Sequence, residues 1–268
     1  MPRIALGLEY DGSAFSGWQS QAHARGVQSV VEAALSSVAD HDVAVTAAGR
    51  TDAGVHAAMQ VVHFDTHASR TERAWMLGAN ANLPVQVSAL WAREMPEAFH
   101  ARYSAIARRY RYIILNRGPR PALAARRVCW IRDPLDASLM HSAAQLFVGE
   151  HDFSSFRAAE CQARTPLRNL HEIDVVRRDE LVVLSVTANA FLHHMVRNIA
   201  GVLIAIGTGE RPVEWAAEVL AARDRSKAGV TAQPGGLYLQ GIRYAEALDL
   251  PSEPEALYAS CPVHPDQV

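Results

Sequence analysis

The chain has 268 residues, of which 49% are apolar and 20% charged, and its formal net charge is −2. This composition is typical of a folded protein and excludes a disordered chain, which would be less apolar and more strongly charged. The cysteines Cys129, Cys161 and Cys261 form no CxxC pair, which disfavours a zinc site or a disulfide framework and favours a reducing, cytoplasmic setting. The N-terminal segment lacks a signal-peptide core, and the apolar stretch 191–207 is too polar to span a bilayer.

The first half of the sequence predicts the order strand, helix, strand, strand, helix, strand. Residues 3–10 (RIALGLEY) alternate and end at Asp11-Gly12, whereas residues 27–39 (VQSVVEAALSSVA) have helical spacing. The six elements are expected at residues 3–10, 27–39, 43–48, 58–65, 71–81 and 87–94. This order is the ferredoxin-like pattern.

The second half predicts a looser echo of the same series. Its strands and helices are expected at residues 110–116, 136–147, 168–177, 181–188, 191–207, 212–222 and 236–244. The fold class is therefore α/β (α+β), with two α/β domains at residues 1–105 and 106–247. Residues 248–268 are rich in proline without a period, and we expect a mobile tail there.

Positive charge is concentrated in one part of the chain. Of the 26 basic residues only Lys227 is a lysine, and between residues 98 and 132 there are nine arginines and no acid. Arginine neutralises phosphate, and the interleaved tyrosines could stack on bases, so this stretch suits an RNA-binding surface. A solvated charged strand would have the same composition, and the arginine preference could also reflect coding bias.

The loop GRTDAGVHA, at residues 49–57, carries the strongest chemical signal. Gly49 and Gly54 permit a sharp turn that presents Asp52, and Arg50 lies two residues before the acid. A neighbouring cation favours the ionised carboxylate, which can act as a nucleophile or stabilise positive charge. The alternative is an ordinary turn in which Asp52 caps backbone amides.

This loop resembles the catalytic signature of the TruA-type tRNA pseudouridine synthases. Seven further segments are similar to that family in the same order and at suitable spacing, so the resemblance covers roughly residues 1–247. They are EYDGSAFSGWQSQ (9–21), VQSVVEAAL (27–35), NANLP (80–84), FHARYSAIARRYRYII (99–114), DFSSFR (152–157), ANAFLHHMVRNIAG (188–201) and GLYL (236–239).

The resemblance implies two RRM-like domains with a shared mixed β-sheet and a central basic cleft. It implies a homodimer that binds tRNA, and isomerisation of uridine to pseudouridine at nucleotides 38–40 of the anticodon stem-loop. No cofactor and no metal are implied, and the chain lacks the GxGxxG and GxxxxGK[ST] motifs.

Family roles carry over to five positions of this chain. Asp52 matches the nucleophile, and Arg197 matches the basic partner of that carboxylate. Tyr110 matches the aromatic residue that stacks on the target uracil, and Arg50 matches the residue that helps to displace the base. Leu237 matches the apolar wall of the pocket.

Two rival functions remain open from the residues. One is an RNA-binding protein that has lost catalysis, although Asp52, Arg197 and Tyr110 are all present. The other is a nucleoside N-glycosidase, which would use the same acid and release the base. Trp18 in GWQSQ could serve packing or touch RNA, and His193 with Arg197 has the spacing of one helical face.

Overall fold

The computed structural model describes residues 1–21 and 23–251, so most of the expected tail at 248–268 lies outside the described residues. The chain divides into two compact units, each of which is mixed α/β. Among the described residues, one unit is Met1–Ile106 with residues 238–251, and the other is Ala107–Leu237. The domain boundaries expected above stay a prediction, because compactness does not show which part folds by itself.

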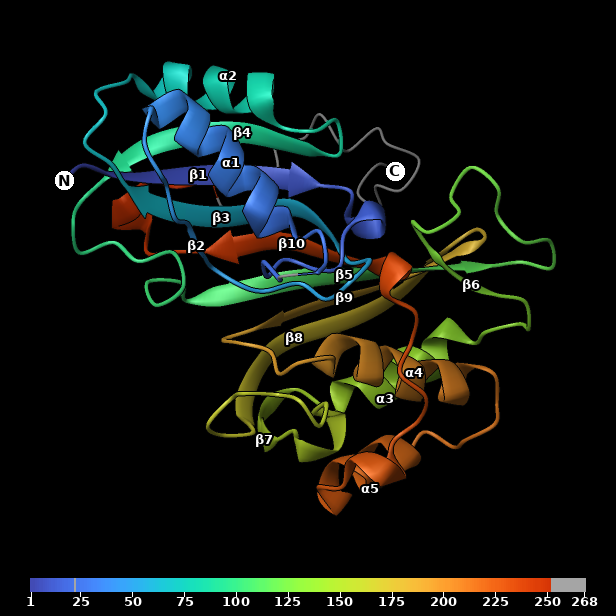
Figure 1. Ribbon diagram of the computed structural model, residues 1–268. Coiled ribbons are helices and arrows are strands. Elements are labelled where there is room, and N and C mark those ends of the chain that lie inside the picture. The colour runs from blue at the N-terminus through green and yellow to red at the C-terminus, as the bar shows by residue number, and fades with distance from the viewer. Residues whose placement is uncertain (22, 252–268) are drawn as a thin grey trace. The chain divides into compact units, whose positions relative to one another are not determined.

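The first unit is a mixed sheet in the order β4-β1-β3-β10. Strand β1 (Arg3–Tyr10) is antiparallel to both β3 (His56–Asp65) and β4 (Val87–Met95), and β10 (Leu237–Arg243) is parallel to β3. The short β2 (Thr46–Ala47) pairs with β3. Figure 1 shows the helices α1 and α2 side by side over this sheet; they span Val27–Ala39 and Glu72–Asn82.

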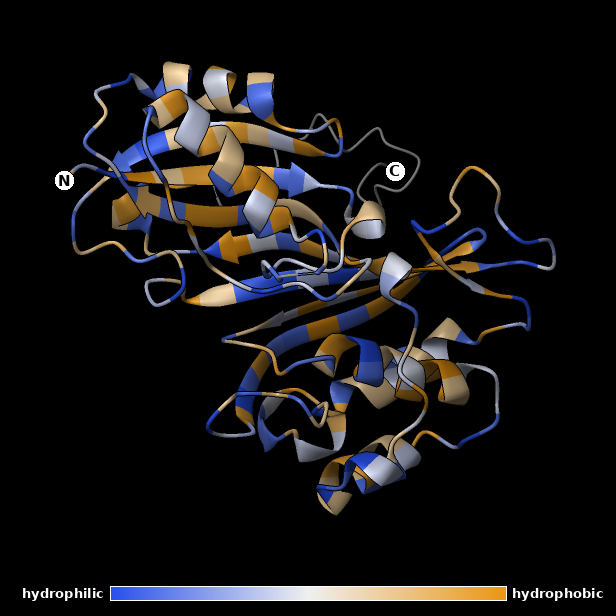
Figure 2. Cartoon of the chain, in the orientation of Figure 1, coloured by the Kyte–Doolittle hydropathy of each residue, from blue (hydrophilic) through white to orange (hydrophobic). Residues whose placement is uncertain are grey.

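Burial of apolar side chains explains this packing. Apolar residues recur along β1 and β3 (Figure 2), and Leu6 and Leu8 of β1 are fully buried. On α1, Val27, Val31 and Leu35 recur at intervals of four residues and are all buried, so one face of the helix covers the sheet.

The second unit contains β5, β9, β8 and β7, each antiparallel to its neighbour in that order. Strand β6 runs parallel to β5. These strands span Ala107–Asn116 (β5), Cys129–Ile131 (β6), Gly149–Asp152 (β7), Leu167–Arg178 (β8) and Leu181–Ala188 (β9). The helices are α3 (Ala137–Gln145), α4 (Met195–Gly207) and α5 (Trp215–Ala222), and Figure 1 places them on one side of the strands.

Several expected elements differ from the structure. Strand β5 begins at Ala107 rather than at residue 110, and α5 begins at Trp215 rather than at residue 212. The strand expected at 43–48 is reduced to β2, and the three- and four-residue strands β6 and β7 were not expected because they are too short for a period. The helix expected at 191–207 begins only at Met195, because His194 adopts a left-handed conformation with φ of 63°. In the described part of the chain, no helix is long and apolar enough to cross a membrane.

Candidate active site

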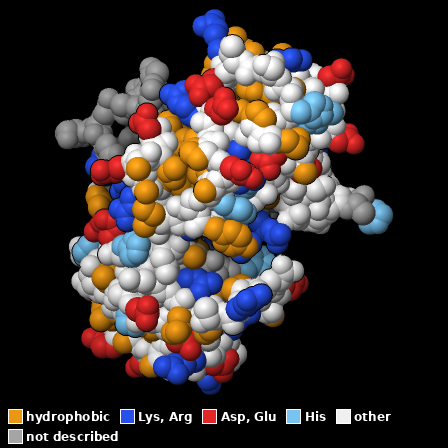
Figure 3. All heavy atoms as spheres, turned by 90° about the vertical axis from the view of Figure 1, so that its left-hand side faces the viewer, with side chains coloured by type: hydrophobic (Ala, Val, Ile, Leu, Met, Phe, Trp, Pro, Cys, Tyr) orange, Lys and Arg blue, Asp and Glu red, His pale blue; other side chains and the backbone are white. Residues whose placement is uncertain are grey.

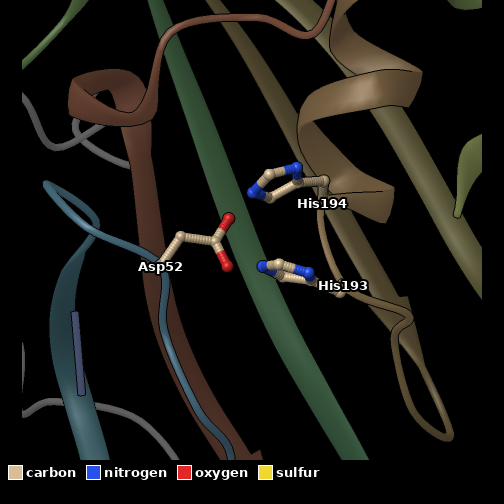
Figure 4. Close-up of side chains that lie close together, drawn as sticks. All are labelled: Asp52, His193 and His194. Carbon is tan, nitrogen blue, oxygen red and sulfur yellow. The ribbon is translucent and has the colours of Figure 1, made fainter. Parts of the chain in front are cut away.

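Asp52 lies on the loop between β2 and β3 (Figure 4), and the residue before it is held in the protein core. The hydroxyls of Thr51 and Tyr10 lie 2.8 Å apart, and Thr51 is 7% exposed. The Trp18 N–H donates to the Thr51 carbonyl at 2.9 Å, and the Val55 N–H donates to the Asp52 carbonyl at 3.1 Å. Asp52 itself is half-buried. The backbone that presents its carboxylate is therefore tied to the core from both sides.

The loop after β1 packs directly on the Asp52 loop, and glycines make this possible. A Cβ on Gly12 would lie 1.9 Å from the Val55 carbonyl oxygen. Gly17 has φ of 98°, and a Cβ there would lie 2.9 Å from the Thr51 carbonyl oxygen. Trp18 is 2% exposed, which favours the packing role for its side chain over contact with RNA.

His56 joins these two loops and was not recognised from the sequence as part of the site. Its Nδ1 accepts the Gly12 N–H at 3.1 Å and lies 3.2 Å from Asp11 Oδ1. Its ring stacks on Tyr238, with the ring centroids 4.7 Å apart. Only its place four residues after Asp52 pointed to it. The buried His56 ring therefore connects the end of the Asp52 loop to the loop after β1.

Arg50 and Asp52 share this loop, and Arg50 is exposed. The other three residues carried over from the family belong to the second unit, on separate elements. Tyr110 lies in β5 opposite Val186 of β9, is 8% exposed, and packs edge-on against Phe191 with centroids 5.1 Å apart.

Leu237 opens β10 directly after the 3-10 turn η4 (Pro234–Gly236) and is 5% exposed. The turn approaches β5 and β6 closely, because a Cβ on Gly236 would lie 2.7 Å from the Ile113 carbonyl oxygen and 3.0 Å from the Cys129 nitrogen. Glycine is thus required immediately before the apolar residue that the family resemblance assigns to the pocket wall.

Arg197 lies in the first turn of α4, and a hydrogen bond to a main-chain carbonyl orients its side chain. Its Nε donates to the Ala232 carbonyl at 2.8 Å, and the Ala232 N–H donates back to the Arg197 carbonyl at 3.1 Å. Nearby, the Tyr112 hydroxyl donates to the Gln233 carbonyl at 2.7 Å. Burial raises the pKa of Tyr112, although the positive charge of Arg197 opposes the shift. The Nε edge of the guanidinium is therefore fixed against the Ala232 carbonyl.

His193 and His194 form a turn that leads into α4 (Figure 4), with their rings 4.0 Å apart. The His193 N–H donates to Cys161 Sγ at 3.4 Å, and the Ala158 N–H donates to the His193 carbonyl at 3.0 Å. Because this turn precedes the helix, the expectation that His193 and Arg197 share one helical face is wrong.

His63 lies on β3 and His67 lies just after it, and the two rings have different neighbours. His63 is buried and accepts the Ala101 N–H at 3.1 Å, whereas His67 stacks on His41 with centroids 4.1 Å apart. The two histidine rings therefore do not contact the same groups.

The arginines at 98–132 do not form a uniform exposed strip. Arg111 is 5% exposed, the Arg108 guanidinium donates to the Asn189 carbonyl, and Arg117 forms an ion pair with Glu180 at 3.1 Å. The exposed members are Arg102, Arg120, Arg126, Arg127 and Arg132. On the face drawn in Figure 3, basic and acidic side chains are interspersed.

Comparison with known proteins places the chain in a family. Residues 8–104 and 143–245 match the tRNA pseudouridine synthase family. The chain is 62% identical over 249 residues to the tRNA pseudouridine synthase A of Nitrosococcus oceani, covering 93% of this chain and 96% of that protein. The chain therefore belongs to the tRNA pseudouridine synthase family.

Two further members of the family are similarly close. The proteins of Coxiella burnetii and Methylococcus capsulatus, both called tRNA pseudouridine synthase A, are 57% and 59% identical to this chain. The match with the Coxiella burnetii protein covers 95% of this chain and 97% of that protein. The match with the Methylococcus capsulatus protein covers 92% of each. A solved archaeal box H/ACA sRNP Nop10–Cbf5 complex aligns with 75% of this chain and 44% of its own at 12% identity. Its TM-score of 0.34 is too low to carry an argument.

The matched ranges include four of the five residues to which the family resemblance assigns a role. Arg50 and Asp52 lie in the first range, Arg197 and Leu237 lie in the second, and Tyr110 lies between the two. As a tRNA pseudouridine synthase the chain is an isomerase that converts uridine in tRNA to pseudouridine.

Proposed function

We propose that this enzyme isomerises uridines at nucleotides 38–40 of the tRNA anticodon stem-loop, with Asp52 as the nucleophile. The observation that carries the proposal is the double anchoring of the Asp52 loop, through the Thr51 hydroxyl and the Thr51 carbonyl, in a chain of this family. A carboxylate on a fixed backbone meets the geometric requirement for attack on one defined atom.

The reaction rearranges bonds within one nucleotide. The N1–C1′ bond of uridine breaks, the base turns, and a C5–C1′ bond forms while C5 loses a proton and N1 gains one. No electron acceptor is consumed, so the reaction needs no redox cofactor, and the family resemblance assigns no cofactor and no metal to it. An ionised Asp52 could add to uracil C6, attack C1′, or act through a glycal, and all three routes use the same carboxylate.

The remaining family residues support this step in the proposal. Arg197 is the counter-charge of the carboxylate, and its fixed Nε is consistent with a defined direction of the guanidinium. Tyr110 offers a ring on which the detached uracil stays stacked, a contact worth about 1–3 kcal/mol per base. Leu237 forms the apolar wall, and Arg50, on the exposed part of the loop, helps to displace the base.

The target nucleotide must leave its stack, which costs a few kcal/mol. We propose that exposed arginines of the 98–132 stretch offset this cost through phosphate contacts. The proposal includes a shared mixed β-sheet, a basic cleft at its centre, and a homodimer that holds one tRNA, all carried over from the family. It also includes a cytoplasmic location, which suits the free thiols of Cys129 and Cys161.

The test is incubation with unmodified tRNA transcripts that carry tritium at uracil C5. Isomerisation releases tritium without a change in strand mass, and carbodiimide-dependent stops in reverse transcription map the product to nucleotides 38, 39 or 40. An abasic product would instead indicate an N-glycosidase. Tight binding with retained tritium would indicate an RNA-binding protein without this activity.

Asp52→Asn tests the role of the carboxylate and should lower tritium release by about a thousandfold or more. The matched control is Asp42→Asn, because Asp42 is an exposed acid of the same unit. The affinity for tRNA should stay within about threefold in both variants, since phosphate contacts and base chemistry are separate terms. Full turnover in Asp52→Asn contradicts the assignment.

A further inference from the structure

The buried side chain of Asn198 lies at the centre of a polar network next to Arg197. Asn198 is 0% exposed, and its Nδ2 donates to the Phe156 carbonyl at 2.7 Å. Its Oδ1 accepts two hydrogen bonds, from Thr231 Oγ1 at 2.7 Å and from Arg225 Nη2 at 3.1 Å. Both ends of the amide are therefore satisfied, as a buried polar group requires.

Arg225 forms hydrogen bonds with the segment 229–231, which follows it in the sequence. It lies in the 3-10 turn η3 (Arg225–Lys227), and its Nη2 also donates to Thr231 Oγ1 at 2.8 Å. Its Nη1 donates to the Gly229 carbonyl at 3.0 Å. One guanidinium thus binds two points of the segment 229–231 and, at the same time, the side chain of α4.

The turn that carries Arg225 is itself anchored. The Asp224 N–H donates to Ser155 Oγ at 2.8 Å, and Ser155 is fully buried. Asp224 Oδ1 in turn accepts from the Ser226 N–H at 2.9 Å and caps the turn. Arg225 therefore starts from a fixed backbone position.

The segment held by Arg225 is the same one that orients Arg197. Thr231 is bonded by the network, and the next residue, Ala232, exchanges the two hydrogen bonds with Arg197. This segment lies directly on α4, because a Cβ on Gly201 would be 1.8 Å from the Val230 carbonyl oxygen. The peptide between residues 231 and 232 is planar and carries the Ala232 N–H, so fixing Thr231 restricts the direction of this N–H, which donates to the Arg197 carbonyl. The Ala232 carbonyl, which accepts from Arg197 Nε, lies only one residue beyond Thr231.

We propose that Arg225 is a positioning residue for Arg197, acting through Asn198, Thr231 and the Ala232 carbonyl. The inference rests on the proposed role of Arg197 in uridine isomerisation. The requirement for arginine follows from its planar fork, because a lysine ammonium cannot reach the Gly229 carbonyl and Asn198 Oδ1 together in this geometry. Arg225→Lys keeps the charge and removes the fork.

The first experiment compares Arg225→Lys with Arg223→Lys as a matched control. Arg223 lies two residues earlier, is 68% exposed, and is 3.6 Å from Asp152. We expect the single-turnover rate of tritium release to fall at least about tenfold in Arg225→Lys and to stay within about twofold in the control. The tRNA dissociation constant should change less than about threefold, because phosphate contacts remain.

The second experiment asks whether Arg225 acts through Arg197, by a double-mutant cycle with Arg197→Lys. If it does, Arg225→Lys should cost less than about threefold in the Arg197→Lys background. An equal penalty in both backgrounds overturns the proposal, because a purely structural role would reduce both rates alike. An affinity loss as large as the rate loss also overturns it, since Arg225 would then be an RNA contact.

A third experiment compares two variants of Thr231. It tests the proposal even if the melting temperature of Arg225→Lys shows that this variant does not fold. Thr231→Ser keeps the hydroxyl and should retain the rate, whereas Thr231→Val removes it and should lose about tenfold. Equal rates in the two variants contradict the proposal. If the wild-type enzyme releases no tritium from any tRNA transcript, the proposed function fails, and this outcome is distinct from all those above.

Discussion

The hydroxyl of Tyr10 lies 2.8 Å from the hydroxyl of Thr51, 41 residues further along the chain. Thr51 directly precedes Asp52, so this buried contact connects the end of β1 to the carboxylate proposed as nucleophile. Burial raises the pKa of Tyr10 to about 12, so its hydroxyl stays protonated at neutral pH.

Tyr10→Phe should lower both stability and turnover. It leaves the Thr51 hydroxyl buried without this partner, which costs about 1–3 kcal/mol of the free energy of unfolding. Urea unfolding and single-turnover tritium release measure the two effects. Tyr103→Phe is the control, because Tyr103 is 77% exposed. If Tyr10→Phe keeps full turnover and loses only stability, Tyr10 contributes to the core and does not position the Asp52 loop for catalysis.

Gly17→Ala should displace the Asp52 loop by crowding the Thr51 carbonyl, whereas Tyr10 contacts the Thr51 hydroxyl. The added Cβ would lie 2.9 Å from the Thr51 carbonyl oxygen at φ of 98°, a combination that costs about 1–3 kcal/mol. We expect slower tritium release and a lower melting temperature. Gly118→Ala serves as the control, since a Cβ there has nothing within 4 Å. Equal rates in the two variants would show that the loop tolerates displacement.

His63 should make stability depend on pH in the acidic range. Burial, followed by the charges of Arg3 and His100, lowers the pKa of His63 to about 4 from an ordinary 6.5. Between these values the unfolded chain binds the proton and the folded chain does not. The free energy of unfolding therefore falls as pH drops from about 6.5 to about 4.

His63→Asn should flatten this dependence, because asparagine does not titrate and its amide oxygen can still accept the Ala101 N–H. Urea unfolding measured between pH 4 and pH 7 gives the slope. His23→Asn, at an exposed histidine of the same unit, should leave the slope unchanged. An unaltered slope in His63→Asn would assign the acid sensitivity to other groups.

Cys161 should react with alkylating agents at lower pH than an ordinary thiol. Burial opposes the shift, but hydrogen bonds from the His193 and Ala163 N–H groups, with the charge of Arg157, lower its pKa. Burial raises the pKa of Cys129, which should stay unmodified. Mass spectrometry after iodoacetamide treatment of a Cys261→Ser variant measures whether Cys161 is modified before Cys129. Faster modification of Cys129 would contradict it.

Elements with a strong local pattern were predictable from the sequence. The bounds of β1 and α1 agree with the expectation because alternation, helical spacing and a following turn are all local signals. The start of α4 was not predictable in this way. The left-handed His194 follows His193, whose backbone forms hydrogen bonds with Cys161 and Ala158, more than thirty residues earlier in the chain.

The sequence by itself determined the family of this protein, through the order of its segments, and it supplied the candidate residues for the chemistry: an acid between two glycines in a loop and an arginine in HHMVRNI. Only the tertiary structure decided how these groups are held. Tyr10 forms a hydrogen bond with Thr51, and Arg225 forms one with Asn198, 27 residues earlier in the chain. No local sequence pattern predicts either contact. Such hydrogen bonds depend on burial and on the approach of distant segments, which exist only once the chain has folded.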